Sequence, residues 1–157
     1  MRALVVSLAI VAAWAPLPAA AMGYFECSVV ESIQLAPERP DHKDYLTHYT
    51  CRVTGGQLDG FAVSVSSRWE TNGDEGKLLG SLGIARKGNT TVVYETAEGV
   101  IRNLRFANGR ATGWDSTATA KVKGATGSAA HLSGKTFVMQ GRLIAPGTFT
   151  MDAVLAN

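Results

Sequence analysis

The chain has 157 residues, of which 15 are basic and 13 acidic, and the charges are scattered without a block of one sign. This near-balance excludes the extended basic surface that binding to nucleic acid or to an anionic membrane needs. A chain of this length is expected to form one hydrophobic core.

The first 21 residues have the pattern of an export signal. Arg2 precedes an apolar run, Ala3–Trp14, which is too short to cross a bilayer. The small residues Ala19 and Ala21 match the A-x-A cleavage rule. We therefore expect cleavage after Ala21, which leaves a single secreted or periplasmic domain at 22–157.

The chain holds two cysteines, Cys27 and Cys51. An even number of cysteines in an exported protein predicts a disulfide. Strands are expected at 24–35 and 45–54, separated by a proline-containing loop at 36–42. If Cys27 faces Cys51 in an antiparallel pair, the two strands form a hairpin that closes on this loop.

Four possible metal ligands lie in or after this loop: Asp41, His42, Asp44 and His48. Imidazole and carboxylate groups bind divalent ions, but the spacing matches no known metal site. We expect a solvated loop here, with no metal and no other cofactor.

Beyond the first hairpin, apolar and polar residues alternate with the two-residue period of a β-strand, and glycine, asparagine and aspartate recur as turn signals. Strands are expected at 60–70, 77–86, 90–97, 99–107, 110–123, 135–145 and 147–155. Eight or nine strands in sequence predict an all-β fold, a closed antiparallel up-and-down barrel of about eight strands, because closure removes exposed edges. A β-sandwich is the alternative. An outer-membrane barrel is disfavoured, because the chain has few aromatic residues for two interfacial girdles.

The clearest hairpin is centred on Asn108-Gly109, a favoured pair for a two-residue turn. In this register Arg102 lies opposite Asp115, on the same face as the apolar Leu104 and Phe106. We expect this face to line the barrel lumen, where the ion pair orients a bound carboxylate or phenol. The alternatives are a register shifted by one residue, or an exposed pair at the barrel mouth worth under ~1 kcal/mol.

Trp69 and Trp114 lie in strands beside polar residues. Their rings can stack on a ligand at the rim of the barrel, or pack over the edge of the core. No pair of titratable residues is placed by its spacing as acid and base, and no nucleophile motif is present, so we expect no catalytic residue.

Residues 122–137 contain a glycine-rich pattern with matching positions at Gly124, Thr126, Gly127, Ala130, Gly134 and Phe137. The pattern resembles a glycine-rich segment late in barrels of the allene oxide cyclase type, which include dirigent proteins and small secreted bacterial proteins. The resemblance implies an eight-stranded barrel whose lumen accepts a small apolar or aromatic molecule. It transfers no activity and no catalytic residue.

Two functions are therefore expected, and an enzyme ranks third. The first is a secreted binding protein that holds a small apolar or aromatic ligand in its lumen, with Arg102 and Asp115 orienting the ligand and Trp69 or Trp114 at the rim. The second is a protein-binding module, such as a periplasmic inhibitor of an exported hydrolase, that inserts a loop such as 36–44. The expected partner is thus a small apolar molecule or an exported protein, and neither nucleic acid nor an integral membrane span is expected.

Overall fold

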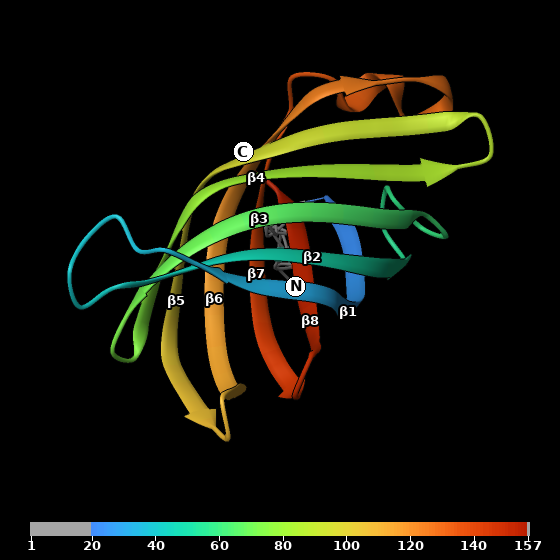
Figure 1. The fold of residues 1–157 in the computed structure, drawn as a ribbon. Coiled ribbons are helices and arrows are strands. Elements are labelled where there is room, and N and C mark those ends of the chain that lie inside the picture. The colour runs from blue at the N-terminus through green and yellow to red at the C-terminus, as the bar shows by residue number, and fades with distance from the viewer. Residues whose placement is uncertain (1–19, 157) are drawn as a thin grey trace, which may run out of the picture.

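The computed structural model describes residues 20–156, which form one closed antiparallel barrel of eight strands (Figure 1). The strands are β1 (Ala21–Leu35), β2 (Lys43–Thr54), β3 (Ala62–Asn72), β4 (Glu75–Lys87), β5 (Thr90–Ala107), β6 (Arg110–Ala125), β7 (Thr136–Ala145) and β8 (Thr148–Leu155). Each strand pairs with its neighbour in the chain, and β8 pairs with β1. The predicted up-and-down barrel is confirmed. Residues 1–19, most of the expected export signal, lie outside the described residues.

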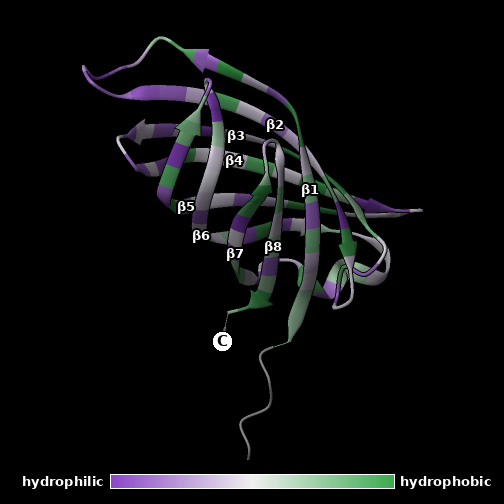
Figure 2. Cartoon of the chain, turned by 90° about the horizontal axis from the view of Figure 1, so that it is seen from below, coloured by the Kyte–Doolittle hydropathy of each residue, from purple (hydrophilic) through white to green (hydrophobic). Residues whose placement is uncertain are grey.

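Alternation along each strand separates an inner from an outer face. In β6, Ala120 and Val122 are buried, whereas Lys121 and Lys123 are exposed. Figure 2 shows the same alternation as bands of apolar and polar residues along the strands. Because the sheet closes on itself, the inner faces of all eight strands share one core.

The first hairpin forms as predicted. Cys27 lies opposite Cys51 in the β1–β2 register, and the two are joined by a disulfide. A bulge in β1 after Val29 changes the far end of the hairpin, where Leu35 pairs with Asp44.

The expected strands 90–97 and 99–107 form a single strand, β5, so the prediction of a turn at Glu98-Gly99 was wrong. The register between β5 and β6 shifts by one residue at Ala97. An extra residue of this kind bends a strand without ending it. The glycine at position 99 therefore lies within a bent strand, not at a turn.

One end of the barrel is sealed by its own side chains. The segment after β2 brings Leu58 over the core, and its N–H donates to the carbonyl of Met22 at 2.9 Å. Between β6 and β7 the short 3-10 helix η1 (Gly127–Leu132) contributes Leu132. Both leucines are 0–1% exposed, as is Phe137. Within residues 20–156, no helix has the length and apolar composition needed to cross a membrane.

Candidate ligand site at the open end of the barrel

The opposite end of the barrel is open. It carries the 36–42 loop and the turns that join β3 to β4, β5 to β6 and β7 to β8 (Figure 1). Four aromatic side chains on the inner face toward this end are only half-buried: Tyr45, Tyr49, Trp69 and Trp114. Buried side chains fill the sealed half of the interior, whereas these four side chains in the other half keep part of their surface exposed.

Two of these aromatic residues are direct cross-strand neighbours. Tyr45 of β2 pairs with Trp69 of β3. The indole Nε1 of Trp69 donates a hydrogen bond to Oγ of Ser67 at 3.0 Å, which holds the ring in one orientation. We refer to Tyr45 and Trp69 as the aromatic platform.

A second group of rings lies on the wall formed by β6 and β8. The ring centroids of Trp114 and Phe149 are 5.2 Å apart, and Phe149 meets Tyr49 edge-to-face at 5.0 Å. Such tilted and edge-to-face contacts are favourable geometries for aromatic pairs. The three rings therefore brace one another in the middle of the barrel.

Tyr94 is a fully buried residue of β5. Its side chain is 1% exposed, and its hydroxyl has no hydrogen-bond partner among the described residues. Burial, and to a lesser extent the neighbouring Tyr49, raise the pKa of Tyr94 well above its ordinary value. The ring lies directly over Gly83, where a Cβ atom would come within 2.1 Å of the ring carbon Cζ. Only glycine leaves room for the ring there.

The predicted Arg102–Asp115 pairing is present, but it lies on the outer face of the barrel. Asp115 is between Trp114 and Ser116, whose side chains point inward, and both Arg102 and Asp115 are exposed. The Asp115 carboxylate accepts a hydrogen bond from the side-chain amide of Asn103 at 2.9 Å. The prediction that this pair faces the lumen was wrong.

A local irregularity in β5 explains the error. Asn103 has a φ of 56°, and the register shifts between Arg102 and Arg105. Strict alternation is therefore lost, so that Leu104 is buried although Arg102 is exposed. Phe106, also predicted to line the lumen, lies near the end of β5 and is 45% exposed.

Comparison with protein-family models, curated proteins and solved structures found no match. The glycine-rich segment 122–137 forms the end of β6, η1 and the start of β7. Gly127 and Gly134 adopt positive φ values, as glycine does most readily. The segment therefore contributes to the sealed end, away from the aromatic platform.

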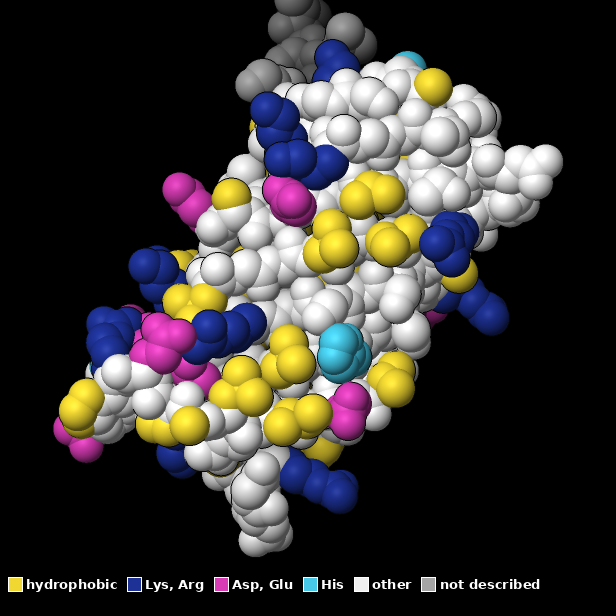
Figure 3. All heavy atoms as spheres, turned by 45° about the horizontal axis from the view of Figure 1, so that its top comes forward, with side chains coloured by type: hydrophobic (Ala, Val, Ile, Leu, Met, Phe, Trp, Pro, Cys, Tyr) yellow, Lys and Arg dark blue, Asp and Glu magenta, His cyan; other side chains and the backbone are white. Residues whose placement is uncertain are grey.

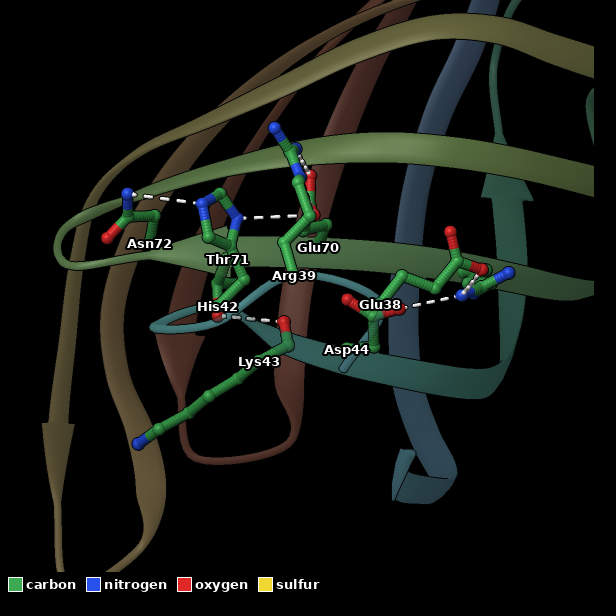
Figure 4. Close-up of polar contacts among 9 residues, drawn as sticks. Glu38, Arg39, His42, Lys43, Asp44, Glu70, Thr71 and Asn72 are labelled. Atoms are coloured by element: carbon green, nitrogen blue, oxygen red, sulfur yellow. Dashed lines mark hydrogen bonds and ion pairs between the residues drawn. The ribbon is translucent and has the colours of Figure 1, made fainter. Parts of the chain in front are cut away.

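The loop predicted to be solvated folds back on the outer face of β2 and β3 (Figure 4). Arg39 forms a bidentate ion pair with Glu70, and His42 Nδ1 lies 3.2 Å from a Glu70 oxygen. Asp44 is completely buried and pairs with Arg68 at 2.7 Å. The sequence did not indicate this burial.

These residues, together with Glu38, form what we call the loop ion cluster. Arg68 also pairs with Glu38 at 2.6 Å. The hydrogen bond from Arg39 lowers the pKa of Glu70 and raises that of Arg39. Each charge thus has a partner of opposite sign from another segment, which indicates a structural role in holding the loop.

An open hollow of about 790 Å³ lies beside the loop ion cluster on the outer face. Lys77 and Arg102 lie in its wall together with Glu75 and Glu98. Figure 3 shows basic and acidic side chains close together on the outer surface. Because the two signs are balanced, this hollow does not select a ligand of either charge.

Proposed function

We propose that this protein binds a small molecule inside the open end of its barrel, through an apolar or aromatic face of that molecule. The observation that supports the proposal is the half-exposed interior surface of Tyr45, Tyr49, Trp69 and Trp114. These residues lie on the inner face of a closed, disulfide-linked barrel, in front of its sealed end. Sites of this kind bind small ligands with little loss of conformational freedom.

Covering these rings with a ligand gains enough free energy to support binding. Burial of apolar surface contributes about 25 cal/mol per Å², so a ligand that buries roughly 200 Å² gains about 5 kcal/mol before the costs of association. The aromatic platform is also held in place before binding, because Ser67 fixes the Trp69 ring. Arg102 and Asp115 take no part in this proposal, because they lie outside.

Inhibition of an exported hydrolase is the second candidate function. It is favoured by the loop ion cluster, which holds the 36–42 loop in one conformation through pairs such as Arg39 with Glu70. Loops that are rigid before binding are typical of protease–inhibitor complexes.

The neutral fluorescent probe N-phenyl-1-naphthylamine tests the first candidate. We expect saturable one-to-one binding to the folded protein, and a loss of affinity of at least about fivefold in Trp69→Leu. Leu82→Ala is the matched control, because Leu82 is 45% exposed in β4, on the outer face. Absence of saturable binding to the correctly folded protein, or equal effects of both variants, would contradict a site inside the barrel.

A further inference from the structure

A row of hydroxyl side chains crosses the inside of the barrel next to the aromatic platform. The row takes one residue from each of the strands β1 to β5, and each of these residues lies opposite the next one in the strand registers. The row, which we call the hydroxyl belt, consists of Ser32, Thr47, Ser67, Ser81 and Thr96. Since neighbouring strands are about 4.8 Å apart, the belt extends over roughly 19 Å of the wall.

The belt lies at the border between the packed and the accessible halves of the interior. Two residues further toward the sealed end, the same strands present Tyr49, Val65, Gly83 and Tyr94. Strand alternation places these residues on the same inner face. The accessibility of the belt varies, because Ser67 is 2% exposed and Thr96 5% exposed, whereas Thr47 and Ser81 are half-buried.

Several hydroxyls of the belt keep hydrogen-bonding capacity. Ser32 and Thr47 share one hydrogen bond at 3.2 Å, and Ser67 accepts from Trp69. Among residues 20–156, no hydrogen-bond partner is seen for the hydroxyl of Ser81 or Thr96. A purely apolar ligand placed over these hydroxyls would displace the water that hydrates them without replacing its hydrogen bonds, and this loss lowers the free energy gained on binding.

The belt and the aromatic platform themselves are neutral, and the first charged side chain on the same face of β2 is the exposed Lys43, two residues beyond Tyr45 at the end of the strand. The aromatic platform, the belt itself and the facing wall around Trp114 and Phe149 carry no charged side chain. A carboxylate or phosphate bound there would lose its hydration without gaining a counter-ion. The site therefore favours a ligand without charge.

An uncharged sugar ring has the properties that these groups match. One face of a pyranose consists of C–H groups, which stack on aromatic rings, and its edge carries hydroxyls that both donate and accept hydrogen bonds. We propose that the ligand of this site is a neutral carbohydrate, with a sugar ring on the Tyr45–Trp69 platform and its hydroxyls on the belt. This inference rests on the proposed function, and it names the class of ligand.

A panel of neutral disaccharides (cellobiose, maltose, lactose and chitobiose) tests the inference by tryptophan fluorescence and calorimetry. We expect saturable binding of at least one of them. Thr47→Val and Ser81→Ala remove hydroxyls from the belt and are each expected to weaken that binding about three- to tenfold, the loss typical of one hydrogen bond. Thr50→Val and Ser66→Ala, on the outer faces of β2 and β3, are the matched controls and should leave the affinity unchanged.

The other outcomes separate this inference from the proposed function. Binding of N-phenyl-1-naphthylamine without binding of any disaccharide would overturn the carbohydrate assignment and leave the interior site in place. Failure of both probes with folded protein would overturn both proposals. Tighter binding of glucuronate than of the neutral sugars, or equal effects of inner and outer hydroxyl variants, would contradict the neutral belt as the recognition element. If Thr47→Val does not fold, Thr47→Ala takes its place.

Discussion

At the scale of single residues, the contact between Gly83 and Tyr94 determines how the middle of the barrel is packed. The Tyr94 ring occupies the place where a side chain at position 83 would lie, and it also packs edge-to-face on Phe137 with ring centroids 5.3 Å apart. One missing Cβ atom thus lets a large ring fill the middle of the barrel.

Gly83→Ala is expected to destabilise the fold by at least about 2 kcal/mol, because the new methyl group overlaps the Tyr94 ring and overpacking is costly. The measurement is urea-induced unfolding followed by circular dichroism. Gly80→Ala in the same strand is the control, since a Cβ there meets nothing within 4 Å. Combining Gly83→Ala with Tyr94→Val should restore part of the lost stability, and a double variant as unstable as the sum of its parts would argue against this contact.

At the scale of elements, the β1–β2 hairpin is held twice, by the disulfide near its centre and by the loop ion cluster at its end. Both cysteines are buried, and they are 24 residues apart in the chain. The ion cluster joins the intervening loop to β3 through Glu70 and Arg68. The loop between the two strands is therefore restrained from both sides.

Replacement of both Cys27 and Cys51 by alanine is expected to lower the free energy of unfolding by about 3 kcal/mol, because the bond limits the freedom of the unfolded chain. Chemical denaturation of the variant and of the oxidised protein measures the difference. The reduced protein should behave like the variant. A difference below about 1 kcal/mol would show that the strand pairing alone restrains this hairpin.

Glu70→Gln tests the loop ion cluster through the pH dependence of stability. Because Arg39 lowers the pKa of Glu70 in the folded state, the carboxylate stabilises the fold above its ordinary pKa, and this contribution is lost as the pH falls through the lowered value. The stability difference between the native protein and Glu70→Gln should thus be greatest near neutral pH and shrink on acidification.

Glu95→Gln is the control for this measurement. Glu95 pairs with Lys123 at 2.9 Å, but both side chains are about half exposed, and exposed pairs contribute only about 0–1 kcal/mol. Thermal unfolding, measured from neutral to acidic pH, compares the stability of each variant with that of the native protein. A constant difference for Glu70→Gln across this range would mean that its charge does not stabilise the loop.

At the scale of the whole molecule, the barrel is asymmetric along its axis. The sealed end carries the buried residues of η1 and of the segment after β2, whereas the open end carries half-buried aromatic and hydroxyl residues. We therefore propose that stability and ligand binding belong to opposite ends of one structure.

Matched leucine truncations test the asymmetry. Leu132→Ala at the sealed end is expected to cost about 2–4 kcal/mol, since the side chain is 1% exposed and its loss leaves a cavity. Leu143→Ala, which removes a half-buried side chain toward the open end, should cost less than half as much. Equal losses of stability in chemical denaturation would contradict a core concentrated at one end.

The sequence alone determined the class of fold and its local pairings, because these depend on short-range patterns. Period-two alternation identified the strands, Asn108-Gly109 placed a hairpin, and the Cys27–Cys51 pairing was predicted from the expected export and the spacing of the cysteines. Trp69 and Trp114 were also singled out, and both lie half-buried on the inner face. The proposed ligand class, by contrast, was not visible, because the belt appears only when five strands are placed in register.

Where a strand contains a bulge or another backbone irregularity, only the tertiary structure decided which of the following side chains face inward. The shift at Ala97 and the left-handed backbone at Asn103 break the alternation on which the inward assignment of Arg102 rested. Asp44 is buried because a loop folds back over it, which no local pattern encodes. A bulge or a folded loop is selected by the packing and ion pairs of distant segments, and these interactions form only when the barrel closes.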